Sequence, residues 1–310
     1  MSLSRRAVRL LLDRGLVRAA DVHRYGLTAR DVSESNGVVL VELGSGQGFA
    51  VKDVGTPREG GQGEPDREIA LYQAAGGTAM LPRLELHDPD AGLLVLEGVI
   101  SARRLDRLAA PHDPLDPRWA TAFGRTLGAW HRLATGLPLK PARPWLLDLE
   151  GPARLPILDR DERLSSLTAA ILADRSHLAA LSAVGTAWAC DTTVHGDIRF
   201  SNVLIRTDGD AVLIDWESSG AGDSRWDLAG GIQEYLSSGG TWQPPSGPVK
   251  AFLDGYATSR QVDFRQLHAF VACRLLVRAL QLITWLDDPT DEVTRHRSLA
   301  REVMTWEVAA

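Results

Sequence analysis

The sequence predicts an α+β fold with two lobes, a small N-terminal lobe over residues 1–98 and a larger lobe over residues 99–310. β-rich runs gather before residue 100, together with one helical segment, whereas helical spacing of apolar residues dominates the remainder. At 310 residues and 44% hydrophobic content, the chain is long and apolar enough to bury two cores. We therefore expect a small antiparallel sheet with a helix, followed by a mainly helical lobe.

The N-terminal lobe is expected to begin with a short helical brace, because apolar residues recur at near-helical spacing over residues 5–18. Strand-like runs follow at residues 38–43, 49–54, 81–86 and 93–99. The first two runs flank a glycine-rich turn and predict an antiparallel hairpin. Asp66 can cap a helix that begins after the glycine-rich connector at residues 55–63.

Helices are expected throughout the second lobe. Their predicted ranges are residues 119–134, 164–173, 176–189, 249–257, 264–286 and 291–308. Two short strands, 203–206 and 211–215, are joined by an Asp-Gly turn. Residues 264–286 are apolar but contain three arginines, which favours a core helix over a membrane span. The Gly, Pro and Ser-rich residues 237–248 could form a mobile flap.

The composition argues against several classes of function. A formal charge of −6 and a pI near 5.8 give no global basic field, so we do not expect nucleic acid as a partner. The first apolar run is interrupted at Asp13 and Arg14, too early for a secretory signal or a membrane span, which predicts a cytoplasmic protein. Cys190 and Cys273 show no CxxC spacing, so neither a disulfide framework nor a structural zinc site is expected.

One segment carries the residue types that phosphoryl transfer requires. It reads His195-Gly196-Asp197-Ile198-Arg199-Phe200-Ser201-Asn202, and a predicted hairpin then leads to Asp215. The reaction needs a carboxylate that orients the attacking hydroxyl, and a carboxamide and a second carboxylate that hold Mg²⁺ against the triphosphate. Asp197, Asn202 and Asp215 supply these groups, and the hairpin is expected to return Asp215 to the same pocket. The alternative is an ordinary turn, but the flanking strands favour the catalytic interpretation.

The same segment, with Leu213-Ile214-Asp215-Trp216-Glu217 after it, resembles the catalytic loop and metal-binding aspartate of the aminoglycoside phosphotransferase and choline kinase family. These proteins are distant relatives of protein kinases, and the resemblance extends from about residue 27 to the end of the chain. It implies a protein-kinase-like fold and a reaction that uses ATP and Mg²⁺. Asp197 would be the catalytic residue, and Asn202 and Asp215 would bind the metal.

Lys52 is a charged residue in the middle of a predicted strand, where it needs a partner. The resemblance implies that Lys52 contacts the α- and β-phosphates of ATP and that Glu68, on the following helix, positions it. Glu59 and Glu64 are rival partners, but they lie in or beside the glycine-rich connector. The alternatives are a solubilising edge-strand charge for Lys52 and a solvated helix-face charge for Glu68.

Two glycine-containing turns are candidates for nucleotide binding. Ser35 and Asn36, in the loop at residues 33–37, could reach the phosphates, although an ordinary Asn-Gly turn explains the same residues. Gly44 to Gly48 lies between two strands rather than before a helix, so it is not a dinucleotide-binding fingerprint.

Residues 93–99 resemble the strand and hinge between the two lobes of the family. The resemblance implies that the backbone of Glu97 and Val99 binds adenine. A buried strand end is the alternative, because the side chains of this run are unspecific.

Four other polar residues match the family pattern and are expected to be structural. His131 and His195 would pack near the catalytic loop. Asp223 and Asp227, which follow the metal-binding aspartate, would cap and anchor the catalytic loop.

The sequence leaves the acceptor open. Residues 194–199, 226–228 and 233–236 look similar to stand-alone kinases of lanthipeptide and thioamitide (RiPP) biosynthesis, so we favour a Ser or Thr hydroxyl of a ribosomal precursor peptide. Such a kinase would need a partner lyase. The alternative is a small hydroxylated molecule such as an aminoglycoside, macrolide, sugar or choline, although Arg199-Phe200 in place of a His-Pro pair weakens the aminoglycoside case. A nucleotide-binding pseudokinase scaffold is disfavoured, because every expected functional residue is present.

Overall fold

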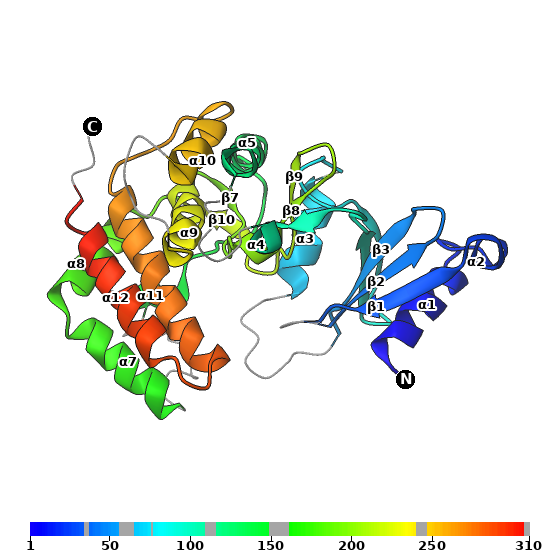
Figure 1. The fold of residues 1–310 in the computed structure, drawn as a ribbon, viewed down its shortest axis with the longest axis horizontal. Coiled ribbons are helices and arrows are strands. Elements are labelled where there is room, and N and C mark those ends of the chain that lie inside the picture. Colours follow the sequence, from blue (N-terminus) through cyan, green and yellow to red (C-terminus); the bar gives the residue numbers. More distant parts are fainter. Residues whose placement is uncertain are drawn as a thin grey trace. The chain divides into compact units, whose positions relative to one another are not determined.

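The computed structural model of the chain describes residues 1–33, 37–55, 65–75, 77–108, 116–148, 161–239 and 247–306. The chain divides into two compact units. Unit 1 comprises Met1–Arg107 and Ser201–Ser218, and unit 2 comprises Leu108–Phe200 and Ser219–Ala310. Unit 1 holds an antiparallel sheet and unit 2 is mainly helical (Figure 1), which confirms the predicted α+β class.

Unit 1 is built on a five-stranded antiparallel sheet with the strand order β1-β2-β3-β5-β4. The strands are β1 (Leu27–Asp31), β2 (Val38–Leu43), β3 (Gly48–Asp53), β4 (Leu84–Asp88) and β5 (Leu93–Glu97). The predicted hairpin of β2 and β3 is confirmed, with Val39 opposite Val51. The strand predicted from residue 81 instead begins at Leu84.

The two faces of this sheet are used differently. Two helices, α1 (Leu3–Asp13) and α2 (Ala19–Tyr25), precede the sheet in the sequence. Helix α1 packs Leu10 and Leu11 into one core with Val39, Val51 and other strand residues, which confirms the predicted brace. Successive strand side chains point to opposite faces, so Lys52, the neighbour of Val51, lies on the other face. There it meets α3 (Pro65–Ala75) through a hydrogen bond.

A second, three-stranded sheet completes unit 1. Its strands are β6 (Arg103–Arg104), β8 (Val203–Ile205) and β9 (Ala211–Leu213), in the order β6-β8-β9. The predicted hairpin of β8 and β9 is confirmed. The N–H of Leu213 donates to the carbonyl of Met80 over 2.9 Å, which ties this hairpin to the N-terminal part of the unit. The chain passes between the units in α4 (Leu105–Leu108), in the 3₁₀ turn η2 (Phe200–Asn202) and again between Ser218 and Ser219.

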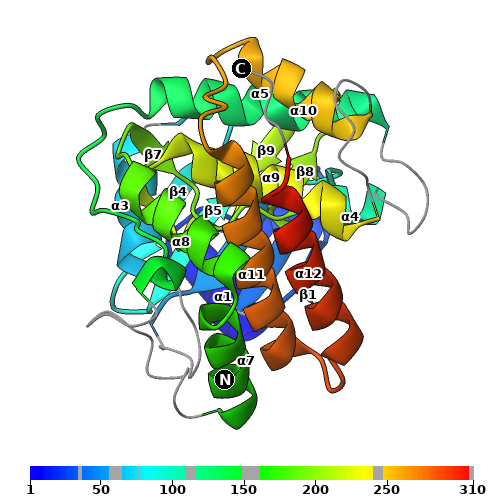
Figure 2. The same cartoon turned by 90° about the vertical axis from the view of Figure 1, so that its left-hand side faces the viewer.

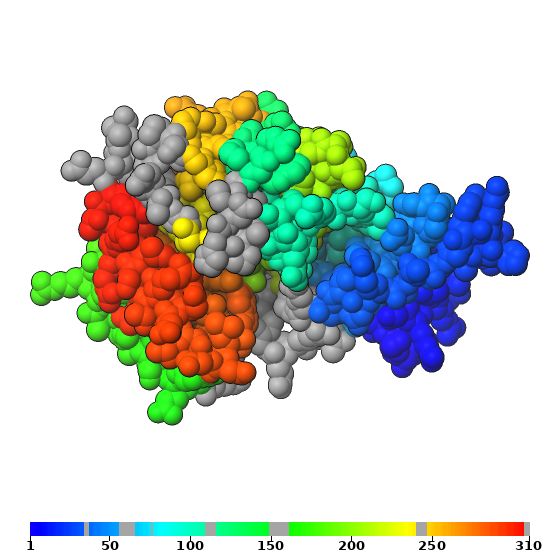
Figure 3. Space-filling view, viewed as in Figure 1, coloured from blue at the N-terminus to red at the C-terminus, as the bar shows by residue number. Residues whose placement is uncertain are grey.

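Unit 2 is dominated by helices. They are α5 (Pro117–Leu133), α7 (Glu162–Leu172), α8 (Arg175–Ala187), α9 (Ser224–Ser237), α10 (Pro248–Ala257), α11 (Leu267–Trp285) and α12 (Thr290–Val303), with the 3₁₀ turn η1 (Trp145–Asp148). Strands β7 (Thr192–Val194) and β10 (Gly220–Gly222) pair antiparallel. Helices α11 and α12 lie side by side (Figures 1 and 2), and α12 forms part of the surface in Figure 3.

Helix α11 is a core helix. By length and composition alone it could cross a membrane, with a mean hydropathy of 1.5 over its most apolar window, but 78% of that window is buried inside the protein. Its charged members, Arg274 and Arg278, are also held within unit 2. These contacts agree with the core helix expected at residues 264–286.

Helix α9 is absent from the sequence prediction because Gly230 and Gly231, near its middle, are unfavourable in helices. Both glycines allow close packing. A Cβ atom on Gly231 would lie 2.6 Å from the ring of Phe252, and one on Gly230 would lie 3.0 Å from Ile198. Tertiary packing therefore outweighs the low local propensity. Of the predicted flap at residues 237–248, residues 240–246 lie outside the described residues.

Candidate active site

Lys52 is bound by three carboxylates of unit 1. Its Nζ atom donates to Oε2 of Glu68 at 2.6 Å, to Oδ1 of Asp215 at 2.5 Å and to Oε2 of Glu217 at 3.4 Å. The side chain of Lys52 is buried, so it cannot be a solubilising surface charge. Lys52, Glu68 and Asp215 were each predicted from the sequence, and unit 1 brings them together.

Glu68 also holds the backbone beside Asp215. Its carboxylate is 1% exposed, and Oε1 accepts the backbone N–H of Trp216 at 3.3 Å. Trp216 is itself buried, and its indole N–H donates to the carbonyl of Leu213 at 3.0 Å. Glu68 is therefore no solvated helix-face charge, because it positions both Lys52 and the segment that carries Asp215.

The charges of this cluster do not cancel. Burial of Lys52 disfavours its ammonium form, but the neighbouring Glu68, Asp215 and Glu217 outweigh burial, and the pKa of Lys52 is raised. The pKa of the nearby Tyr72 is also raised, in this case mainly by burial and further by the charges of Glu68 and Asp215. One ammonium among three carboxylates leaves an excess of negative charge, which favours the binding of a cation.

Asp215 adopts a left-handed backbone conformation with a φ of 66°. This region is sparsely populated by residues other than glycine, although aspartate tolerates it better than most, and such conformations cluster at functional sites. The side chain of Asp215 is 29% exposed, so its carboxylate is accessible. The carbonyl of Asn202 accepts the N–H of Ile214 at 3.0 Å. The β8–β9 hairpin therefore brings Asn202 next to the segment of Asp215, as the sequence predicted.

Asp197 belongs to unit 2, where Asp227 of α9 anchors its loop. The carboxylate of Asp227 accepts the backbone N–H of His195 at 2.6 Å and that of Gly196 at 3.0 Å. Gly196 has a φ of 83°, a conformation that favours glycine at this turn. The indole N–H of Trp226 donates to the carbonyl of Gly196 at 3.0 Å. Buried groups thus hold the backbone of the two residues before Asp197.

Two arginines lie beside the carboxylate of Asp197. Arg199 donates to both oxygens, from Nε to Oδ1 at 3.1 Å and from Nη2 to Oδ2, and Nη2 of Arg274 lies 3.9 Å from Oδ1. Burial acts to raise the pKa of Asp197, but the charges of Arg199 and Arg274 outweigh it and lower the pKa. Asp197 is therefore a carboxylate at neutral pH.

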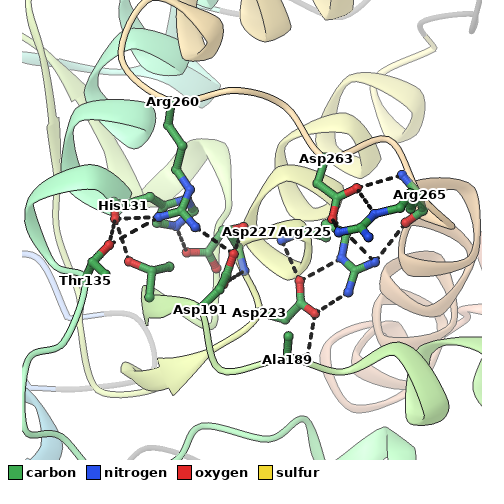
Figure 4. Close-up of polar contacts among 12 residues, drawn as sticks. His131, Thr135, Ala189, Asp191, Asp223, Arg225, Asp227, Arg260, Asp263 and Arg265 are labelled. Atoms are coloured by element: carbon green, nitrogen blue, oxygen red, sulfur yellow. Dashed lines mark hydrogen bonds and ion pairs between the residues drawn. The ribbon is translucent and has the colours of Figure 1, made fainter. Parts of the chain in front are cut away.

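His131 and Asp223 contact the helix that carries Asp227 (Figure 4). Nε2 of His131 lies 3.0 Å from Oδ2 of Asp227. Its Nδ1 lies 2.9 Å from the hydroxyl of Tyr256. Asp223 is the N-cap of α9, where its carboxylate accepts the N–H of Arg225 at 3.0 Å. The predicted capping and anchoring roles of Asp223 and Asp227 are confirmed.

The other predicted nucleotide contacts are those of Ser35, Asn36, Glu97 and Val99. Ser35 and Asn36 lie outside the described residues. Glu97 ends β5, and its backbone N–H donates to the carbonyl of Arg83 at 2.8 Å, so this amide is used by the sheet. Val99 follows as a residue without regular secondary structure. The adenine contacts of Glu97 and Val99 remain predictions.

Three charged residues of the two clusters are not predicted from the sequence. Glu217 is part of the quoted motif, but nothing in the motif indicates that it shares Lys52. Arg199 shows no sign in the sequence of binding the aspartate two residues before it. Arg274 does carry a usable signal, because an arginine in an otherwise apolar helix needs a buried partner.

Comparison with known proteins agrees with this architecture. The family model described as the phosphotransferase enzyme family matches residues 27–290. No curated protein is a significant match.

Several solved kinase structures share the fold at low sequence identity. The choline kinase LicA of Streptococcus pneumoniae has a TM-score of 0.60 and 18% identity, with 94% of this chain and 98% of that chain covered. The ethanolamine kinase of Plasmodium vivax has a TM-score of 0.61 and 15% identity, with 95% and 86% covered. The amicoumacin kinase hAmiN, solved with AMP-PNP and Ca²⁺, has a TM-score of 0.56 and 14% identity, with 96% and 95% covered. The predicted protein-kinase-like fold is confirmed.

Proposed function

This chain belongs to the phosphotransferase enzyme family, and we propose that it transfers the γ-phosphoryl group of ATP to a hydroxyl group. The observation that carries the proposal is the contact of Lys52 with both Glu68 and Asp215. A buried ammonium held by two carboxylates is placed to bind phosphate oxygens, and Lys52 would steady the α- and β-phosphates while Glu68 keeps it in position.

Asn202 and Asp215 would hold Mg²⁺ in this reaction. Their oxygen atoms suit a hard cation, Asp215 is accessible, and the carboxylates around Lys52 leave negative charge for a cation to neutralise. Among the described residues no three His, Cys, Asp or Glu side chains form a metal-binding group. Mg²⁺ usually takes only one or two carboxylates from the protein and completes its shell with substrate phosphates and water. When bound, Mg²⁺ neutralises charge on the triphosphate.

Asp197 would orient the acceptor hydroxyl. Because its pKa is lowered, Asp197 is ionised and can accept a hydrogen bond from that hydroxyl. The oxygen of the acceptor then attacks the γ-phosphorus in line as the bond to the β-phosphate oxygen breaks, and the hydroxyl proton moves toward Asp197. The anchoring of residues 195 and 196 by Asp227 keeps the carboxylate in a fixed position.

The nucleotide would be held by further contacts that we propose from the sequence. The backbone of Glu97 and Val99 would bind adenine, and Ser35 and Asn36 would reach the phosphates. The N–H of Glu97 is committed to Arg83, so we propose that Glu97 contributes its carbonyl to adenine.

For the acceptor, we propose a Ser or Thr hydroxyl of a ribosomal precursor peptide in the cytoplasm, with a separate lyase as partner. The similarity of the segments around Asp197 and Asp227 to peptide kinases of lanthipeptide pathways supports this choice. A small-molecule acceptor is the second candidate, because the similar solved structures are named as choline, ethanolamine and amicoumacin kinases.

The test is phosphoryl transfer from γ-labelled ATP with Mg²⁺, offered in parallel to Ser- and Thr-containing precursor peptides and to choline, aminoglycoside and sugar panels. Label on a peptide supports the peptide kinase, and label on a small molecule supports the second candidate. Failure to bind Mg·ATP together with failure to label any acceptor would contradict the proposal.

A further inference from the structure

Positive charge gathers beside Asp197 within unit 2. Arg199 binds both carboxylate oxygens, and Arg274 lies 3.9 Å away. Arg278, one helical turn after Arg274 on α11, joins this group through Trp285. The guanidinium carbons of Arg199 and Arg278 lie 4.8 and 4.9 Å from the centroid of the Trp285 ring. Three guanidinium groups therefore neighbour the residue that would orient the acceptor hydroxyl.

The three arginines have different partners. Arg274 is buried and donates to the carbonyls of Gly196 at 3.3 Å and Ile198 at 2.9 Å, so it supports the loop. Arg199 is committed to Asp197. The Nε atom of Arg278 is buried and has no hydrogen-bond partner within the part of the chain that the structure describes. A buried guanidinium N–H without a partner is costly unless a ligand completes it.

The carboxylates that act on Arg278 are Glu234, Asp197 and Glu292, and each of them already has another partner. Glu234 is the carboxylate that acts most strongly on Arg278, but its oxygens already accept the backbone N–H of Phe200 at 2.8 Å and the amide of Gln233 at 3.2 Å. Asp197 pairs with Arg199 and Arg274, and it would accept a hydrogen bond from the acceptor hydroxyl during the reaction. An external anion would give the buried Nε atom of Arg278 a partner.

Trp285 restrains the two outer arginines, Arg199 and Arg278, which are both half-buried. Trp285 is 47% exposed, and both guanidinium groups stack against its ring. Stacking restrains the guanidinium planes while their N–H groups remain directed along the plane, which is the geometry that binds a carboxylate or phosphate in a bidentate manner.

We propose that the acceptor carries a carboxylate or phosphate group close to its reacting hydroxyl, and that Arg199 and Arg278, supported by Trp285, bind this anion. The inference rests on the proposed phosphotransfer and narrows its acceptor. When the acceptor binds, the hydrogen bonds between Asp197 and Arg199 break. Asp197 then accepts a hydrogen bond from the acceptor hydroxyl, and Arg199 donates to the anion of the acceptor. A cationic acceptor such as choline or an aminoglycoside would instead meet like charge.

The experiment compares matched acceptors with the full chain. One pair is a seryl peptide with Glu or Gln next to the serine, and the other is a hydroxy acid and its amide. For each, binding is measured by calorimetry and phosphorylation by kcat/KM. We expect the wild type to favour the acidic member of at least one pair by roughly tenfold or more. The pair that shows the preference identifies the anion as part of a peptide or of a small molecule.

Substitutions of Arg278 and Arg199 test whether these two residues bind the anion of the acceptor. Arg278→Gln and Arg199→Lys should each reduce the acidic-to-neutral ratio by roughly tenfold, because a bidentate guanidinium contact is lost. Arg265→Gln is the matched control, since Arg265 is an exposed arginine of unit 2 that pairs with Asp263. It should leave the ratio unchanged.

The outcomes separate this inference from the proposed function. Equal or weaker binding of the acidic members by the wild type overturns the inference. So does an Arg278→Gln variant that loses Mg·ATP affinity while keeping its acceptor preference, since the anion would then be a phosphate of ATP. A binding preference without any transfer of label would contradict only the phosphotransfer. Transfer without a charge preference would contradict only the inference.

Discussion

The ammonium of Lys52 lies 2.6 Å from Oε2 of Glu68, although 16 positions separate the two residues in the sequence. Lys52 comes from β3 and Glu68 from α3, on the sheet face opposite to the α1 core. The same carboxylate accepts the N–H of Trp216 at 3.3 Å. Glu68 therefore couples the phosphate-binding lysine to the backbone next to Asp215.

Removing the charge of Glu68 should weaken nucleotide binding. In Glu68→Gln the side chain keeps an acceptor oxygen, but Lys52 loses its most buried carboxylate and is drawn toward Asp215. We expect the Kd of Mg·ATP to rise by roughly tenfold, which calorimetry can measure. Glu85→Gln is the control, because Glu85 pairs only with the exposed Arg83 among the contacts described for it. An unchanged Kd in Glu68→Gln would argue that Lys52 does not contact the nucleotide.

Asp215→Ala should remove the dependence of nucleotide affinity on Mg²⁺. The variant loses the accessible carboxylate assigned to the metal, so ATP should bind with similar affinity in Mg²⁺ and in EDTA, whereas the wild type should bind ATP more tightly in Mg²⁺. The measurement is a pair of ATP titrations for each protein. Equal Mg·ATP affinity of the variant and the wild type would rule out the metal assignment.

Asp227→Asn should destabilise unit 2 in a pH-dependent manner. Burial opposes ionisation of Asp227, but hydrogen bonding and the charge of His131 outweigh it and lower the pKa of Asp227. The stabilisation is therefore complete above the ordinary aspartate pKa, about 3.9, and is lost as the pH falls through the lowered folded-state value. We expect the free energy of unfolding in urea to drop by about 3 kcal/mol at pH 7, a gap that closes only at strongly acidic pH.

The control for this experiment is Asp254→Asn, since Asp254 forms an exposed pair with Lys250 one turn away. Its free energy of unfolding should change by less than about 0.5 kcal/mol. The difference in the free energy of unfolding between the wild type and Asp227→Asn should persist at pH 5. A difference that disappears between pH 7 and pH 5 would contradict the lowered pKa of Asp227.

Two glycine substitutions should act in opposite directions. A Cβ atom on Gly124 of α5 would lie 1.9 Å from the carbonyl oxygen of Phe252 on α10, so Gly124→Ala should cost about 3 kcal/mol by forcing the helices apart. Gly185 of α8 has only the end of the Arg143 side chain nearby, at 3.7 Å. Gly185→Ala should therefore stabilise the protein by about 0.5 to 1 kcal/mol through helix propensity. Thermal unfolding distinguishes the two, and equal effects would contradict the close helix crossing.

The fold was predictable wherever local pattern and tertiary environment agree. The nearly continuous apolar run of β2 forms a strand with alternating burial, and the helical spacing of α5 matches the face that it buries. Helix α9 was not predictable, because Gly230 and Gly231 lower its propensity and only the nearby Phe252 and Ile198 explain why glycine is needed.

Parts of the candidate active site were likewise predictable from the sequence, and other parts were not. Asp197, Asn202 and Asp215 were predictable because the chemistry fixes both their residue types and their spacing. The pairing of Lys52 with Glu68 needed only the order of one strand and one helix. The packing of Arg199 and Arg278 on Trp285 depends on how α11 lies in unit 2. No local pattern encodes that placement.

The central claim is that Asp197 orients a hydroxyl for attack on the γ-phosphate of ATP. Its most direct test is the rate of label transfer from γ-labelled Mg·ATP by Asp197→Ala, with the Kd of Mg·ATP measured on the same sample. We predict a loss of at least roughly a hundredfold in the rate with little change in the Kd, because Asp197 acts on the acceptor. A variant that transfers label at the wild-type rate would contradict the account.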